Sequence, residues 1–406
     1  MTQSDLTTRA FGVVGSASPT EAGEDLSVAD VLGPLKARTN YYATLCRVKR
    51  RRLRVKDTGM AVGSTCFHLM SRTCGGAIFF DETEKEGLVL VMKRMAAFSG
   101  IKLLTYCVMG NHFHALVRVP KREIWLKQFE GAGGEQRLME HLKVLYSKGF
   151  RDLFQVELAN LRKDGREAEA QQYLEEMKAR FCDVSVYARE VKTRFCRWYN
   201  KRHGRRGTVW MERFRSVIVE GKRGREANDE QRAKSALDAL KVMAAYIDLN
   251  PVRAGMVERA KDYRWSGWGA ALTGEKLAVE GLCDVTETVS GKWESAGKVV
   301  YARWLGAAEE EAKREFRIRK AEAEEDGGES PQAETERAKE GSFFLKTVRA
   351  FTRGVAVGSE AFVEAIFQSH RPQFGPRRES GGRHLDGNTS TVLEGLRTLR
   401  DLRRRR

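Results

Sequence analysis

The sequence predicts an α+β fold, a sheet of about four or five strands with helices over one face. Two observations lead to this prediction. Segments with the alternation of β-strands are interleaved with segments of helical spacing. The strand segments also lack the long apolar runs of a doubly wound parallel sheet. The chain has 406 residues, 41% of them hydrophobic, which suffices for roughly two or three domains and at least one sizeable core.

The first expected elements are a strand, a helix and a hairpin. The stretch GSTCFHLMSRT, from Gly63, has the alternation of a strand. In the next segment, apolar residues recur at helical spacing from Leu88 onward behind an acidic first turn, and Gly100 ends the helix. Residues 102–119 lack helix caps and are dense in Leu, Val, Tyr and Phe, so we expect a buried strand or hairpin there.

A helix, a strand and a further helix are expected later in the chain. The stretch VYAREVKTRFCRWYNKRHGRRG is amphipathic and ends at glycine, which is typical of a helix. The next stretch, TVWMERFRSVIVEG, returns to the alternation of a strand. Residues 234–250 are strongly helical in composition, and we expect Pro251 to stop that helix.

The positive charge of the chain is concentrated in runs. The formal net charge is +17. Residues 46–56 hold seven basic and no acidic side chains, and residues 192–215 hold nine basic side chains against the single acid Glu212. One such run alone is compatible with a solvated surface, but two runs on either side of a histidine motif favour a nucleic acid as partner.

The composition also excludes several classes of protein. No apolar run reaches the roughly 18 residues of a membrane span, and the N-terminal residues lack the basic start and apolar core of a secretory signal. The seven cysteines form no CxxC pair, which argues against a disulfide framework and a cysteine-rich zinc site. We therefore expect a soluble, cytoplasmic protein without a membrane partner.

Two histidines one residue apart lie in the strand-like stretch TYCVMGNHFHALVRVP. On a strand, His112 and His114 point to the same face, while Phe113 points to the other. Two neutral imidazoles side by side form a bidentate site for a divalent metal ion, which would polarise a phosphoryl oxygen. Taken alone, the pair favours the simpler interpretation, two histidines that decorate a sheet face.

A second group of polar residues lies in the stretch AAYIDLNPVRAG. In a helix over residues 234–250, Tyr246 and Asn250 are four apart and share one face, so one helix carries a candidate nucleophile and a candidate amide ligand. Because the pKa of tyrosine is about 10, a nearby cation is needed to favour the phenolate. Asp248 is an alternative ligand that faces away from Tyr246. A core tyrosine and a helix-ending asparagine are the simpler interpretation of this motif alone.

Four stretches occur together in a fixed order: TYCVMGNHFHALVRVP, FCRWYNKRHGRRGTVWMERFRSVIVE, AAYIDLNPVRAGMV and DYRWSGWG. In sequence and order they resemble the REP-associated tyrosine transposases, which are single-tyrosine HUH transposases related to the smallest bacterial insertion sequences. The resemblance covers roughly residues 60–272, about half of the chain. The HxH pair alone is weak evidence, whereas its combination with YIDLNPVRAG makes the resemblance specific.

The resemblance implies a ferredoxin-like antiparallel sheet with helices on one face. His112 and His114 match the HUH histidines, Tyr246 matches the catalytic tyrosine, and Asn250 takes the place of a polar third metal ligand. In such enzymes Mg²⁺ or Mn²⁺ polarises the scissile phosphate of single-stranded DNA. The tyrosine attacks that phosphate to give a 5′-phosphotyrosine and a free 3′-hydroxyl.

Relatives in this family act on hairpins of extragenic palindromic repeats. The resemblance therefore implies single-stranded or hairpin DNA as the partner, and a monomer or homodimer as the active form. It also implies association with the nucleoid and no small-molecule substrate.

Arginines near the four motifs are candidate DNA contacts. Arg213 and Arg215 alternate with Phe214 on the predicted strand, and Arg72 ends the first strand. Arg253 is a candidate for phosphate binding or for capping the preceding helix through its dipole. The full set of candidates is Arg72, Arg205, Arg206, Arg213, Arg215 and Arg253.

Three aromatic residues of the same stretches have two possible roles. Trp198, Tyr199 and Trp210 are candidates for stacking on bases. Packing in the core is the favoured interpretation.

The chain divides into six expected regions. They are a flexible leader (1–38), two parts of the HUH catalytic domain (39–120 and 191–272) around a helical insertion (121–190), a charged helical linker (273–340) and a small basic helical C-terminal region (341–406). The insertion and the C-terminal extension depart from the compact members of the family. We expect the C-terminal region to clamp a hairpin or its flanking duplex.

Three functions compete. The leading hypothesis is a metal-dependent DNA nickase and strand transferase. The first alternative is a domesticated DNA-binding protein of the same fold that does not cut, against which the intact histidines and tyrosine count. The second is an RNA-binding module, which requires exposed aromatic side chains on the sheet, where this sequence has imidazoles instead.

Overall fold

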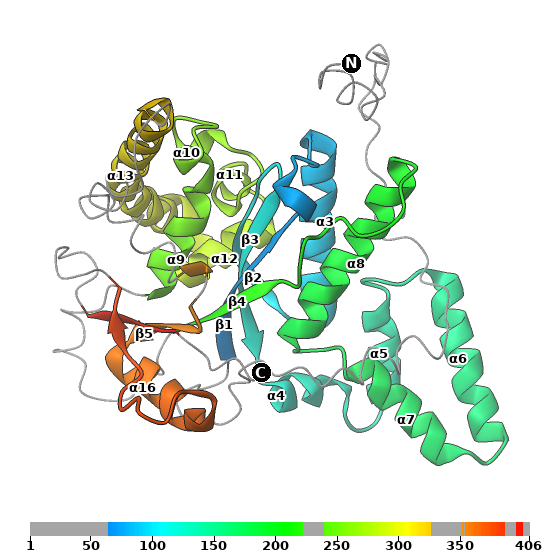
Figure 1. Ribbon diagram of the computed structural model, residues 1–406. Coiled ribbons are helices and arrows are strands. Elements are labelled where there is room, and N and C mark those ends of the chain that lie inside the picture. Colours follow the sequence, from blue (N-terminus) through cyan, green and yellow to red (C-terminus); the bar gives the residue numbers. More distant parts are fainter. Residues whose placement is uncertain (1–63, 222–238, 326–350, 353, 386–394, 401–406) are drawn as a thin grey trace, which may run out of the picture.

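Figure 1 shows the computed structural model of the chain, which describes residues 64–221, 239–325, 351–352, 354–385 and 395–400. The expected leader at 1–38 and the basic run at 46–56 lie outside the described residues. None of the described helices combines the length and the apolarity that a membrane span needs.

Within the described residues, seven strands form one mixed sheet in the order β2-β3-β1-β4-β5-β7-β6. Neighbouring strands are antiparallel except β4 and β5, which run parallel. The α+β class is confirmed, but the expectation of a purely antiparallel sheet of four or five strands is wrong, because C-terminal strands extend it. The strands are β1 (Ser64–Arg72), β2 (Lys102–Val108), β3 (His112–Pro120), β4 (Arg215–Val219), β5 (Ala356–Ser359), β6 (Arg383–His384) and β7 (Leu396–Leu399).

Helices α3 (Glu82–Ser99) and α8 (Val184–Arg202) lie together on one side of the sheet (Figure 1). The Asp81 carboxylate accepts the Glu84 N–H at the start of α3, and Gly100 ends the helix in the left-handed conformation with φ of 68°. The Tyr187 hydroxyl of α8 donates to the Met92 carbonyl of α3. This layer covers the sheet face that carries Phe113, whose ring packs against Trp210 with centroids 5.6 Å apart.

A second helical layer covers the opposite face of the sheet (Figure 1). It contains α9 (Ala239–Asp248) and α12 (Lys276–Thr286), which contact β2 directly. The expectation of helices on one face is therefore wrong. The physical reason is visible in β2, which is buried at six consecutive positions from Leu103 to Val108, whereas a strand with one open face would alternate.

The region expected to be a charged helical linker, 273–340, is largely helical where the structure describes it. Helix α13 (Lys298–Glu325) follows α12, and its residues Tyr301, Leu305 and Ala312 are buried on one side of the helix. The helix is low in large apolar residues, but these few recur at helical spacing and suffice for packing. Residues 326–340 lie outside the described part. Shorter helices of this layer are α10 (Asn250–Arg253) and α11 (Gly267–Leu272).

The insertion after β3 is helical, as expected. It extends to one side of the molecule (Figure 1) and packs around its own apolar residues, among them Phe154 and Leu158. Its expected end at residue 190 is too late, because α8 begins at Val184 with the Asp183 carboxylate as its cap. The helices of the insertion are α4 (Arg122–Leu126), α5 (Gly134–Leu142), α6 (Lys148–Lys163) and α7 (Glu167–Lys178).

The C-terminal region contains strands as well as a helix, so the expectation of a helical region is wrong. The N–H groups of Ile218 and Glu220 donate to the carbonyls of Val355 and Val357, which joins β5 to the edge of β4. Pairing with the edge of β4 makes this segment a strand, which a local helical pattern does not reveal. The region also contains α16 (Glu360–Ser369). The short helical turns among the described residues are Cys74–Gly76, Lys127–Phe129, Ala260–Asp262, Ser290–Lys292, Trp293–Gly297 and Arg371–Gln373.

Candidate functional site

The two histidines of the HxH motif begin β3 and share one face of the sheet. The register of β1 and β3 puts His112 opposite Arg72 and His114 opposite Met70. The two imidazole centroids are 5.1 Å apart. His112 is partly exposed at the end of the strand, whereas His114 is buried, so the pair extends from the surface into the layer of α9.

The hydrogen bond of His112 determines which of its nitrogens carries the proton. His112 Nδ1 lies 2.6 Å from Asn111 Oδ1, and Asn111 Nδ2 donates to the Gly76 carbonyl at 2.7 Å. Because that second bond fixes the orientation of the amide, Oδ1 is the acceptor and His112 Nδ1 is the donor. A neutral His112 is left with an unprotonated Nε2, which is the form that binds a metal ion.

A third histidine, His68 of β1, completes the polar group on this face. His68 Nε2 lies 2.8 Å from His114 Nδ1, and His68 Nδ1 lies 2.9 Å from the Phe351 carbonyl oxygen. Sequence reasoning missed this residue. Its alternation with Met70 and Arg72 was the available signal, but only strand pairing puts it beside His114.

All three imidazoles are held in the neutral form at neutral pH. Burial lowers the pKa of His68 to about 4. Burial, followed by the charges of Arg72 and Arg253, lowers the pKa of His112 to about 4. Burial first, and then the neighbouring histidines and the same two arginines, lowers the pKa of His114 well below its ordinary value. Neutral imidazoles are available as metal ligands without prior loss of a proton.

Tyr246 is on the side of α9 that faces the histidines. Its ring centroid lies 5.8 Å from that of His114 and 6.0 Å from that of His68. The Arg253 guanidinium lies over the same ring at 4.9 Å from its centroid, and the Phe351 ring packs against it. The side chain is only 2% exposed. The structure therefore brings the candidate nucleophile, a cation and the HxH pair together.

Asn250 follows a break in the helix. Helix α9 ends at Asp248, and Pro251 lies in the first turn of α10, so Pro251 starts a short helix rather than stopping one as expected. The Asn250 side-chain N–H groups donate to the carbonyls of Tyr246 and Ile247 at 2.9 and 3.2 Å. These bonds tie the amide to the end of the tyrosine helix, and its oxygen is the atom that would act as a metal ligand.

Asp248 does not belong to the site. Its carboxylate is fully buried and accepts hydrogen bonds from the Thr105 hydroxyl, the Tyr301 hydroxyl and the Trp268 N–H. All of these donors belong to the packing between β2 and the helices around it. The alternative assignment of Asp248 as a metal ligand is therefore wrong, and the residue has a structural role.

The two unprotonated imidazole nitrogens are donors of the kind that a divalent first-row metal ion takes as ligands. In the described part of the chain, no group of three or more His, Cys, Asp or Glu side chains has the geometry of a metal site. His112 Nε2 and His114 Nε2 would be the nitrogen ligands, and Asn250 Oδ1 would be an oxygen ligand. A centre with so few protein ligands leaves positions for phosphate oxygens.

The candidate arginines fall into two groups. Arg72 and Arg253 act electrostatically on the histidines, and Arg215 lies opposite Met70 on the same sheet face, where it pairs with Glu212 at 2.6 Å. The second group follows α8. Arg205 stacks on Phe79, and Arg206 is exposed in the loop that follows α8.

Arg213 is exposed but is not part of a strand. The strand predicted over residues 208–221 begins only at Arg215, and before it Trp210 forms an isolated bridge with Thr73, the residue after β1. The predicted alternation of Arg213 with Arg215 on β4 is therefore wrong. Arg213 lies two residues before the first residue of β4.

Trp198, Tyr199 and Trp210 are buried, with exposed fractions of 6%, 6% and 5%. Their packing in the core is confirmed. Helices cover both faces of the central strands, so the described residues leave no open sheet face on which bases could stack. This argues against the RNA-binding alternative.

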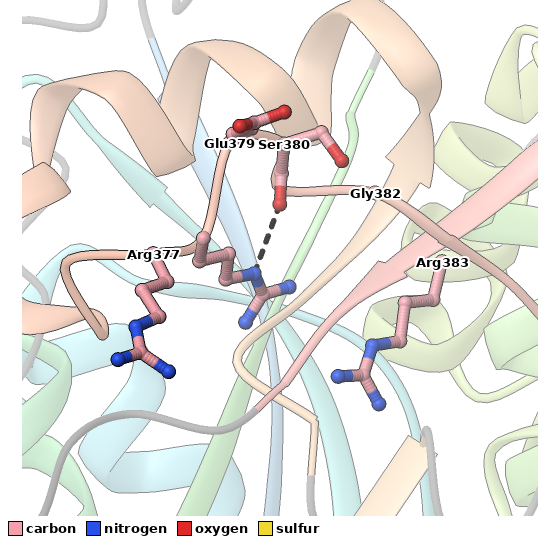
Figure 2. A pocket seen from close by; sticks show the side chains of 6 residues that line it. Arg377, Glu379, Ser380, Gly382 and Arg383 are labelled. Carbon is pink, nitrogen blue, oxygen red and sulfur yellow. Dashed lines mark hydrogen bonds between the residues drawn. The ribbon is translucent and has the colours of Figure 1, made fainter.

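A separate basic hollow lies in the C-terminal region, with a volume of about 250 Å³. Arg378 is structural here, since its guanidinium donates to the carbonyls of Ser380, Gly381 and Arg400. In Figure 2 the side chains of Arg377 and Arg383 extend away from Glu379. The lining residues are Arg377, Arg378, Glu379, Ser380, Gly382 and Arg383.

No family model matches the chain, and neither the curated proteins nor the solved structures contain a match.

Proposed function

We propose that this protein is a metal-dependent, single-stranded DNA nickase and strand transferase of the single-tyrosine HUH type, similar to the REP-associated tyrosine transposases. One observation carries the proposal. Tyr246, far from the HxH motif in sequence, packs against His114 with ring centroids 5.8 Å apart. A nucleophile next to two neutral imidazoles is the arrangement that metal-assisted attack on a phosphate requires.

The ferredoxin-like core is part of this proposal. It would consist of β1, α3, β2, β3, α8 and β4, which follow one another as strand, helix, strand, strand, helix, strand apart from the inserted helices. The antiparallel order β2-β3-β1-β4 supports it, as does the location of α3 and α8 on one side of the sheet. The second helical layer and strands β5 to β7 would be additions to that core.

In the proposed reaction the residues of the site have distinct tasks. His112, His114 and Asn250 would hold a divalent metal ion, which would supply Lewis-acid polarisation of the scissile phosphate. Tyr246 attacks the phosphorus atom, the bond to the 3′-oxygen breaks, and the DNA 5′-phosphate becomes attached to the tyrosine. The phenol loses its proton, and the leaving 3′-oxygen gains one.

Arg253 would assist the tyrosine in this step. Its guanidinium lies 4.9 Å from the centroid of the Tyr246 ring, and the side chain is 6% exposed. A buried cation over the ring favours the negative charge that develops on the phenol. The same charge is close enough to the histidines to help keep them neutral.

Single-stranded DNA, in the form of a hairpin end, is the proposed substrate. Arg72 and Arg215 lie on the histidine face of the sheet, and the exposed Arg205, Arg206 and Arg213 lie in the segment between α8 and β4. These side chains would bind backbone phosphates and position the scissile bond, while the basic hollow of the C-terminal region would bind the duplex of the hairpin.

A DNA-binding protein of the same fold that does not cut is the second candidate. The observation in its favour is the burial of Tyr246, which is 2% exposed and covered in part by Phe351. A phosphate can reach the hydroxyl only when a covering side chain moves. The two candidates differ in one product, a covalent protein–DNA adduct.

The test is adduct formation with labelled hairpin oligonucleotides in the presence of Mn²⁺. We expect a denaturant-resistant adduct with the native protein and none with Tyr246→Phe, which keeps the ring but lacks the nucleophilic oxygen. His112→Ala should also form no adduct but should keep salt-sensitive DNA binding. An adduct formed by Tyr246→Phe, or none formed by the native protein on hairpins from the host genome, would overturn the proposal.

A further inference from the structure

His68 is the third histidine on the sheet face, and the proposed reaction gives it no task. It lies in the middle of β1 and is 1% exposed. Its ring stacks on that of His114, with centroids 5.1 Å apart and planes 16° from parallel. Burying a polar ring at this position is costly unless both of its nitrogens form hydrogen bonds, and both do.

The direction of these two hydrogen bonds follows from the Phe351 carbonyl, which bonds to His68 on the side away from His114. The Phe351 carbonyl oxygen can only accept, so His68 Nδ1 must carry a proton. A neutral imidazole has one N–H, so His68 Nε2 is the acceptor and His114 Nδ1 is the donor across the 2.8 Å contact. His114 Nε2 is then left without a proton. A cationic His68 would reverse the second bond, but the burial of both rings favours the neutral forms.

We propose that His68 is a positioning residue for the metal ligand His114, and that the Phe351 carbonyl sets the tautomer of both rings. The proposal rests on the proposed metal role of the HxH pair. Metal-binding histidines generally donate their second N–H to a carboxylate, a carbonyl or water, which orients the ring and raises its basicity. Here the acceptor is the His68 imidazole, and its other hydrogen bond connects His114 to the C-terminal region.

This arrangement makes the C-terminal region a component of the metal centre. Phe351 precedes β5, so its carbonyl belongs to the segment that leads into the added strands. His112 has a local partner instead, since Asn111 is its neighbour in sequence. The two ligands of the pair therefore depend on different parts of the chain.

Two substitutions separate a hydrogen-bonding role of His68 from a space-filling role. His68→Phe keeps a ring of similar size but removes both bonds. His68→Gln has an amide N–H that can donate to Phe351 and an oxygen that can accept from His114. A residue that only fills space would tolerate phenylalanine better than glutamine.

The experiment is a calorimetric titration of the full-length protein with Mn²⁺ in the absence of DNA. We expect His68→Phe to weaken Mn²⁺ binding about 10- to 100-fold, and His68→Gln to retain most of the native affinity. Leu116→Ala is the matched control, because Leu116 lies opposite His68 on the same face and is equally buried. It should reduce stability without a comparable loss of Mn²⁺ affinity.

The outcomes distinguish this inference from the proposed function. If the native protein binds Mn²⁺ and His112→Ala does not, equal affinity of His68→Phe and the native protein overturns the inference alone. If the native protein binds no Mn²⁺, the metal role of the pair fails as well. For the case in which His68→Phe does not fold, the histidine ¹⁵N NMR spectrum of the native protein decides, since we expect protonated Nδ1 in both His68 and His114. A proton on His114 Nε2 would overturn the proposal.

Discussion

Arg253 is the residue whose location differs most from its expected roles. It was a candidate for phosphate binding or for capping a helix, and the structure has its guanidinium over the Tyr246 ring. Arg253 ends the short helix α10, which follows α9 after a break, and residues seven apart share one face where a helical path continues. The helical spacing of seven puts both residues on one side, but only the structure shows that the guanidinium lies over the ring.

Replacing Arg253 by methionine should slow cleavage more than it weakens DNA binding. Methionine preserves the apolar part of the side chain but removes the cation over the tyrosine, a loss that corresponds to roughly a tenfold lower rate. The measurement is the single-turnover cleavage rate at saturating hairpin DNA, with Arg253→Lys as a control that keeps a positive charge. A lower affinity with an unchanged rate would instead assign Arg253 to phosphate binding.

At the scale of the helix and strand, Asp248 connects α9 to β2. Burial raises the pKa of its carboxyl to about 7, against the effect of its hydrogen bonds from Tyr301, Thr105 and the backbone. The titratable groups beside it are Tyr106, Cys107 and Tyr301, whose pKa values burial raises well above their ordinary values, so they stay neutral below pH 7. Asp248 is therefore the group of this contact that titrates.

The stability contributed by Asp248 should decrease with rising pH. Its folded-state pKa lies above the unfolded value of 3.8, so its contribution is fully present below that value and is lost as the pH rises through 7. Between these limits the free energy of unfolding should fall by at most about 1.4 kcal/mol per pH unit through this group. Asp248→Asn should lack that dependence.

Denaturant unfolding of the native protein and Asp248→Asn across this pH range checks the effect. The buried histidines titrate in both proteins, so their contribution cancels in the difference between the two curves. Parallel curves would show that Asp248 does not bind its proton more tightly in the folded state.

The elements of the first half of the chain could largely be predicted from the sequence. The helix after Asp81, its end at Gly100 and the hairpin of β2 and β3 follow from caps and alternation, which are local properties. The prediction makes strand β4 too long, because residues 208–214 alternate like a strand but form an isolated bridge, from Trp210 to Thr73 after β1. Alternation indicates an extended backbone, but it does not show whether another strand pairs with that segment.

At the scale of the whole molecule, the C-terminal region adds a basic surface at a distance in sequence from the HxH motif. Its strands continue the sheet from β4, and Arg383 of β6 lines the basic hollow together with Arg377. A polyanion held at both places would span the histidine face and the C-terminal strands. Such binding releases counterions from each phosphate contact and depends strongly on salt.

Replacing Arg377 and Arg383 together by serine should weaken hairpin binding and reduce its salt dependence. The slope of log affinity against log salt should decrease by about two for two lost phosphate contacts. Cleavage of a short unpaired oligonucleotide should be unchanged, because that substrate does not reach the C-terminal region. A matched control replaces two other exposed arginines, Arg166 at the N-cap of α7 and Arg303 on α13. An equal change of slope in the control would contradict a specific duplex contact.

The sequence by itself determined the α+β class, the order of the first strands and helices, and the presence of two imidazoles on one face of β3. These properties depend on residues near one another in the chain, so the spacing of apolar residues and the helix caps indicate them directly. The tertiary structure alone decided that helices cover both faces, that the C-terminal region extends the sheet, and that His68 and Phe351 join His114. Each of these depends on contacts between segments that are far apart in the sequence. Such contacts are made by backbone hydrogen bonds in a particular strand register, and no local sequence pattern indicates them.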